Sequence, residues 1–195
     1  MKQRKHPQAL SFLFLSEMWE RFGYYLMIGI FTLYLKDAKT KYGFEMSEAE
    51  SASLYGTFIA LVFFTPFIGG LLADRILGYR IPIVIGGLLM GAGYCMMGIH
   101  SYSMLYSGMV LVIAGNGLFK PNISTLLGNL YNDDRYRDQK DEGYNIFYMG
   151  INIGAFVCNI VSAFLINKYG YAVAFVGAGI GMFVEIGRAS CRERV

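Results

Sequence analysis

The sequence predicts an all-α integral membrane protein with six spans. Of its 195 residues, 55% are hydrophobic and only 16% are charged, whereas soluble domains carry about 25% charged residues. The charges are nearly absent from several long runs and gather in the short segments between them. A span needs ~20 apolar residues at a rise of 1.5 Å per residue, and the 24 glycines suit close helix packing in lipid.

The apolar runs place the spans in order along the chain. They are predicted at about residues 10–35, 53–73, 81–99, 102–127, 144–166 and 169–184. Polar links separate them at residues 36–50, in a tight turn at 74–80, at 100–101, at 132–142 and near 167–168. The last run falls below the usual minimum of about 17 residues. We therefore expect a bundle over residues 1–184 with a truncated sixth helix, followed by a non-native or cytoplasmic tail over 185–195.

The basic residues of the links predict the orientation. One side carries the larger set, namely Lys2, Arg4, Lys5, Arg75, Arg80, Arg135, Arg137 and Lys140. Lys and Arg concentrate in cytoplasmic loops, so we expect a multi-pass protein of the cell membrane, inner or plasma, with a cytoplasmic N-terminus. The first apolar run is too long for the core of a cleavable signal peptide.

The first span contains a charged stretch at Glu17, Glu20 and Arg21. A single charge at the centre of a membrane helix costs at least ~2.5 kcal/mol. At about 100° per residue, these three residues and Tyr24 share one face. That face is expected to look into a protein interior or a water-filled cavity. A functional site is the default interpretation, and a structural ion pair between two helices is the alternative.

The fourth span adds Asn116, Lys120 and Ser124 on neighbouring angles of one face. Lys120 could snorkel to the headgroups, or it could pair with Glu17 or Glu20 across the bundle. In the second case, two cations and two carboxylates form a neutral cluster. Such a cluster could bind a proton by losing one ion pair, which is the basis of a proton-coupled switch.

The fifth span carries Asn145, Tyr148, Asn152 and Asn159, which fall within about 60° on a helical wheel. Interhelical hydrogen bonding could account for one or two of them. Three asparagines and a tyrosine in register instead predict the polar wall of a cavity.

The turn after the second span contains Gly70, Asp74, Arg75, Gly78 and Arg80. It could be a charged link that follows the positive-inside rule. Its spacing, however, resembles the signature loop between helices two and three of the major facilitator superfamily. The resemblance implies a cytoplasmic latch that holds one conformation of a rocking bundle.

Three further motifs resemble the proton-dependent oligopeptide transporter (POT/PTR) family within that superfamily. They are Glu17-x-x-Glu20-Arg21-Phe22-x-Tyr24-Tyr25, the stretch from Gly117 to Ser124, and the stretch from Phe147 to Gly154. The resemblance covers about residues 10–184 and implies the N-terminal six-helix bundle of a two-bundle transporter.

Carried over residue by residue, the resemblance makes Glu17, Glu20, Arg21 and Lys120 the proton-coupling cluster. It implies that Tyr24, Tyr25 and Asn152 line the substrate site and that Lys120 also meets the substrate carboxylate.

The sequence departs from the family pattern at three positions. Family members that carry small peptides often have Arg where this chain has Ile28, and many have Tyr at the position of Phe63. Animal members have His where this chain has Gly56, so carboxylates must carry the proton. These departures concern the substrate more than the fold.

The expected function is therefore a fragment of a proton-coupled symporter for di- and tripeptides or peptide-like solutes. The alternatives are a related transporter for a modified amino acid or an anion, or a non-transporting membrane bundle. An enzyme is not expected, because the sequence shows no nucleophile–base pair and no metal-ligand set. We expect no cofactor besides the coupling proton, no metal and no nucleic acid. The expected partners are the bilayer, a small peptide and a second six-helix bundle absent from this chain.

Overall fold

The computed structural model of the chain describes residues 6–39 and 42–192, without the side chains of residues 189–192. Its long helices are α1 (Ala9–Lys36), α2 (Glu48–Leu72), α3 (Arg80–Met97), α4 (Tyr102–Leu130), α5 (Lys140–Tyr169) and α6 (Tyr171–Arg192). A short π-helix, η2 (Ala73–Leu77), follows α2, and a 3₁₀ turn, η3 (Arg137–Gln139), precedes α5. The basic residues Lys2, Arg4 and Lys5, which contribute to the predicted orientation, lie outside the described residues.

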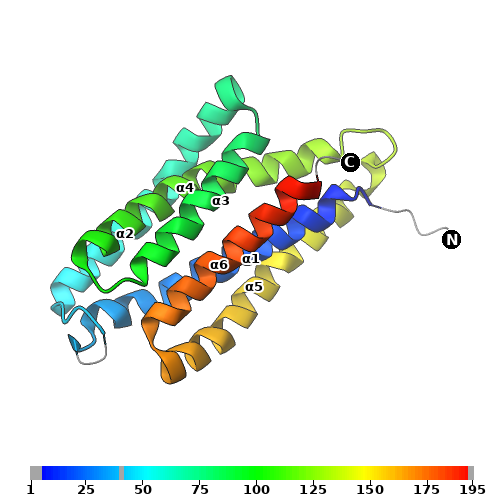
Figure 1. Cartoon of the computed structure of the whole chain (residues 1–195). Coiled ribbons are helices and arrows are strands. Elements are labelled where there is room, and N and C mark those ends of the chain that lie inside the picture. Colours follow the sequence, from blue (N-terminus) through cyan, green and yellow to red (C-terminus); the bar gives the residue numbers. More distant parts are fainter. Residues whose placement is uncertain (1–5, 40–41, 193–195) are drawn as a thin grey trace.

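The long helices run up and down through one bundle (Figure 1). The start of α1, the end of α6 and the link between α4 and α5 lie at one end of it, and the links after α1, α3 and α5 lie at the other. The chain therefore crosses the bundle once with each long helix. α3 packs most extensively against α4, and α1 packs against α5.

Five helical segments of the described chain are long and apolar enough to cross a membrane by length and composition. They correspond to α2 with η2, α3, α4, α5 with η3, and the first part of α6. α1 is long enough at 28 residues, but with its charged stretch it is not among these five segments. The predicted all-α architecture is confirmed, and the charged stretch is what distinguishes the first helix.

Two predicted links are shorter than expected because charged residues continue the neighbouring helices. Asp74 and Arg75 lie in η2 rather than in a turn. The actual turn is made by Gly78 at a φ of 67°, and its amide donates to the carbonyl of Ala73 at 2.9 Å. α5 likewise begins at Lys140. Two acidic residues lie in its first turn, where their negative charge interacts favourably with the helix dipole and stabilises the helix.

The predicted end of the sixth helix at Val184 is wrong as a structural boundary, because α6 continues to Arg192. Ile186 is buried against α3, and a Cβ at Gly87 would lie 2.5 Å from its Cδ1. Glu185 is also buried and lies near Ser16, yet neither carboxylate oxygen has a hydrogen-bond partner of good geometry among the described residues. A buried carboxylate without a partner is costly. The non-native or cytoplasmic character of residues 185–195 stays a prediction.

Paired glycines set the distance between α3 and α4. A Cβ at Gly115 would lie 2.5 Å from the carbonyl oxygen of Gly86, and a Cβ at Gly93 would lie 2.7 Å from the carbonyl oxygen of Gly108. Backbone is therefore in contact with backbone at two levels of this helix pair. Small residues allow such close approach in membrane helices.

Replacing Gly115 by Ala should destabilise the bundle by about 1–3 kcal/mol, because the added methyl group would force α3 and α4 apart. Thermal unfolding of the complete protein in detergent measures the effect. Gly29→Ala is the matched control, since a Cβ there meets nothing within 4 Å. A Gly115→Ala protein that unfolds at the same temperature as the parent would contradict this account of the packing.

Candidate functional site

The centre of the site is an ion triad formed by Glu17, Glu20 and Arg21 on α1. Arg21 donates from Nε and Nη2 to both carboxylate oxygens of Glu20, and its Nε lies 3.4 Å from Oε1 of Glu17. Glu20 is 0% exposed, Glu17 4% and Arg21 5%. As predicted, the charged face of α1 looks into the bundle. The ion pairs of the triad join residues of one helix, α1. The alternative prediction was an ion pair between two helices.

Close packing of the neighbouring helices removes the triad from solvent. A Cβ at Gly154 on α5 would lie 2.4 Å from the carbonyl oxygen of Met18 and 3.3 Å from Cβ of Arg21. On the other side, the ring of Tyr94 on α3 packs against Gly23. The triad holds two carboxylates and one guanidinium in this space. A buried cluster with an excess negative charge is unfavourable unless a cation or a proton compensates it.

Lys120 reaches the site from α4, but among the described residues no ion pair joins it to Glu17 or Glu20, which was one of the two alternatives for this lysine. Its Nζ lies 6.0 Å from the ring centroid of Tyr24 and 5.5 Å from that of Phe63. Cζ of Arg21 lies 4.7 Å from the same Tyr24 centroid. Both oxygens of Glu20 are bonded to Arg21, and the lysine meets the site through the aromatic ring. The structure thus brings all four predicted coupling residues into one region.

The predicted substrate residues divide into an exposed and a buried group. Tyr25 is 36% exposed, and Asn152 is exposed on α5 together with Asn145, Tyr148 and Asn159. Among the described residues, none of these four α5 side chains forms a hydrogen bond to another helix. This stripe therefore forms an open polar face. Tyr24 is only 5% exposed, because its ring packs beside Arg21. It therefore does not form part of the open face.

Comparison with known proteins identifies the family. The model of the POT family matches residues 76–187 of this chain. The chain belongs to the POT family. The dipeptide and tripeptide permease A of Yersinia pestis is 40% identical over 188 residues, which are 95% of this chain and 36% of the permease. The permease A of Escherichia coli K12 is 39% identical over 186 residues, 93% of this chain and 35% of its own length.

Solved POT structures share the fold. A mutant peptide transporter POT in complex with alafosfalin has a TM-score of 0.90 at 36% identity, over 97% of this chain and 39% of that chain. A POT family transporter in complex with 5-aminolevulinic acid has a TM-score of 0.90 at 32% identity, over 98% and 40%. The chain is thus a multi-pass membrane protein with the six-helix bundle of a major facilitator superfamily transporter. It spans about a third of the length of its curated relatives.

The predicted latch loop of this POT family chain lies on the surface. Asp74, Arg75 and Arg80 are exposed. Gly70 faces Pro121 of α4, and its Cβ would lie 3.5 Å from that proline's Cβ. A hydrogen bond to Asp74, together with the charge of that carboxylate, raises the pKa of Tyr79. The carboxylate therefore has a partner within its own loop, and the role of the loop as a latch stays a prediction.

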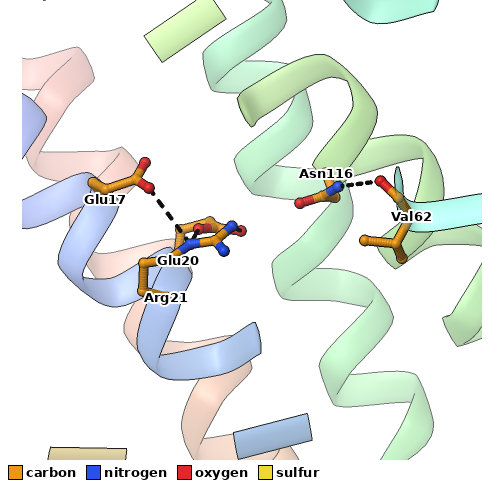
Figure 2. A network of polar contacts seen from close by, with 5 residues as sticks. All are labelled: Glu17, Glu20, Arg21, Val62 and Asn116. Carbon is orange, nitrogen blue, oxygen red and sulfur yellow. Dashed lines mark hydrogen bonds and ion pairs between the residues drawn. The ribbon is translucent and has the colours of Figure 1, made fainter. Parts of the chain in front are cut away.

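Two polar residues of the region were not among the predicted site residues. For Asn116 on α4 the sequence predicts only a face shared with Lys120, and it predicts no role for Tyr94. Both are 0% exposed, and Nδ2 of Asn116 donates to the carbonyl of Val62 on α2 at 3.0 Å (Figure 2). A single tyrosine in an apolar, glycine-rich span gives no pattern that distinguishes it from packing. Among the described residues, no group of three His, Cys, Asp or Glu side chains could hold a metal ion.

Proposed function

We propose that this chain is the N-terminal part of a proton-coupled symporter that imports di- or tripeptides or peptide-like solutes by alternating access. The observation that carries the proposal is the ion triad of α1, buried beside an open polar face. A site for the proton and a surface for a solute then lie on neighbouring helices of one bundle. The names of the curated relatives, which are dipeptide and tripeptide permeases, support the same substrate class.

The coupling would follow from the charge of the triad. Arg21 pairs with two carboxylates. When Glu20 takes up one proton, its ion pair with Arg21 is lost, and Arg21 keeps only its ion pair with Glu17. Each protonation state therefore favours a different set of partners around α1. A ligand or proton shifts a conformational equilibrium only through such differential interactions. We propose that protonation from outside favours loading, and that loss of the proton inside favours release.

The substrate would lie on the wall formed by Tyr25 and Asn152, with Lys120 supplying positive charge for its carboxylate. A solute with two charged ends suits a wall that combines a cation with amide groups. The opposing contacts would come from a second six-helix bundle, so this fragment alone should not transport. We place the complete protein in the cell membrane with its N-terminus in the cytoplasm, and propose no enzymatic activity and no cofactor besides the proton.

A related transporter for a modified amino acid or an anion is the second candidate. It is favoured by Ile28 and Phe63, which remove a cation and a hydroxyl group expected in peptide carriers. The ring of Phe63 instead lies under the Lys120 amine. A structural neighbour in this family is in complex with 5-aminolevulinic acid, which supports this candidate.

The test is uptake of a labelled dipeptide by the complete protein, expressed from the uninterrupted gene and reconstituted in vesicles. An inward proton gradient should drive accumulation, and dissipating the gradient with a proton carrier should stop it. Unlabelled 5-aminolevulinic acid serves as competitor for the second candidate. If neither the dipeptide nor the gradient affects uptake, the proposed function is wrong.

A further inference from the structure

Besides Oε2 of Glu17 within the ion triad, two buried polar atoms beside it have no hydrogen-bond partner in the described part of the chain. They are the hydroxyl of Tyr94 and Oδ1 of Asn116, and both side chains are 0% exposed. Buried polar groups are almost always paired with protein or ordered water. The hydroxyl therefore needs an acceptor and Oδ1 needs a donor, and a water molecule can supply both.

The position of Tyr94 is fixed by α1. A Cβ at Gly23 would lie 2.9 Å from Cε2 of the tyrosine ring and 3.4 Å from its hydroxyl oxygen. Gly23 lies one turn after Glu20 on the same helix, so the Tyr94 ring contacts α1 next to the triad. The hydroxyl thus lies at the edge of the triad, on the α3 side.

The orientation of Asn116 is fixed by α2. Its Nδ2 donates to the carbonyl oxygen of Val62, and this bond assigns the amide so that Oδ1 is the free atom. In Figure 2 this oxygen points to the side on which Glu20 and Arg21 lie. Side chains lean toward the N-terminus of their helix. Because α3 and α4 run in opposite directions, Tyr94 and Asn116 lean toward one another.

We propose that Tyr94 and Asn116 bind a water molecule beside the ion triad and that this water delivers the proton to Glu20. The inference rests on the proposed function and adds two positioning residues, from α3 and α4, to the coupling site. Water would accept from the Tyr94 hydroxyl and donate to Oδ1 of Asn116 and to the Glu20 carboxylate. These are three hydrogen bonds, the number typical of a buried water.

The proton comes from a hydronium ion of the outside solution, which passes it to the bound water and is left as neutral water. A protonated water at this site gives one proton to a carboxylate oxygen of Glu20, an O–H bond forms there, and neutral water remains. The neutral carboxyl group no longer holds Arg21 as an ion pair. Glu20 is fully buried, so a proton must reach it through bound polar groups, and this site supplies them.

Other titratable groups also face the triad, and their titration must be distinguished from the effect of the water site on the pH dependence of uptake. Tyr24 lies on α1, Tyr55 on α2 near Tyr24, and Lys120 on α4. Glu185 of the predicted tail lies on α6 near Ser16, and α5 presents Gly154 to Arg21. The variants below alter none of these groups.

The test uses Tyr94→Phe and Asn116→Leu in the complete protein, with driven uptake of a labelled dipeptide measured as a function of pH. Loss of the water removes a donor from the Glu20 carboxylate, so the midpoint of the pH profile should move upward by about 0.5–1 unit. Exchange of dipeptide without a gradient should stay within about twofold of the parent, because the solute wall is intact. Tyr34→Phe is the matched control, since it removes a buried hydroxyl that bonds to the carbonyl of Met97.

The outcomes separate this inference from the proposed function. If Glu20→Gln abolishes driven uptake while both variants keep the midpoint of the parent, the function stands and the water site is wrong. If the complete protein carries no dipeptide, a high-resolution density map decides the site by itself. Density for a water within about 2.7–3.2 Å of the Tyr94 hydroxyl and of Oδ1 of Asn116 supports it; continuous packing without such density overturns it.

Discussion

Replacing Glu20 by Gln in the complete protein should lower proton-driven dipeptide uptake by at least about tenfold. The amide cannot take up a proton in the working range, and it cannot form the charge-assisted bidentate pair that Arg21 makes with the carboxylate. Exchange of dipeptide across the membrane without a gradient should be affected less, since it needs no net proton movement. Initial rates with and without an inward proton gradient, measured in the same vesicles, give the comparison.

Glu142→Gln is the matched control for this prediction. Glu142 belongs to the first turn of α5, its side chain is 68% exposed, and its carboxylate lies 3.7 Å from His6 outside the triad. The same chemical change there should leave driven uptake unaltered. If Glu20→Gln also retains full gradient-driven uptake, the triad is a structural ion pair, and the coupling role proposed for it is wrong.

The sequence was sufficient to predict the bundle and the burial of the triad. Long apolar runs can only be helices in a bilayer, because helices satisfy every backbone polar group internally. Three charges on one face of such a run must then turn inward. The polar stripe of α5 was predictable in the same way, from the angular positions of Asn145, Asn152 and Asn159. All three are exposed on one open face.

The partners within the site could not be predicted, because periodicity gives a residue's direction but not the shape of what it meets. Arg21 binds its own neighbour Glu20, and Lys120 lies over two aromatic rings instead of a carboxylate. Tyr94 enters the site only because Gly23 leaves space for its ring. Helix ends were misplaced for a related reason. Asp74 and Glu185 interrupt an apolar run, but a helix can continue through charged residues.

Replacing Arg21 by Met should destabilise the complete protein by about 3–5 kcal/mol. Methionine approximates the volume of the arginine stem but leaves Glu17 and Glu20 buried without a counter-charge. Removing one partner of a buried pair costs more than the pair itself contributes. Thermal unfolding in detergent and the yield of folded protein measure the effect. Arg21→Lys should be milder, because lysine keeps the charge but not the bidentate geometry.

The double variant Arg21→Met with Glu20→Gln tests the physical reason. It removes a charge of each sign, so much of the stability lost in Arg21→Met should return, and the two substitutions should be strongly non-additive. Driven uptake should stay abolished in this stable protein, because the proton acceptor is gone. If Arg21→Met alone unfolds at the temperature of the parent, the triad is not buried as described. If the double variant recovers driven uptake together with stability, the triad serves the fold and the proton binds elsewhere.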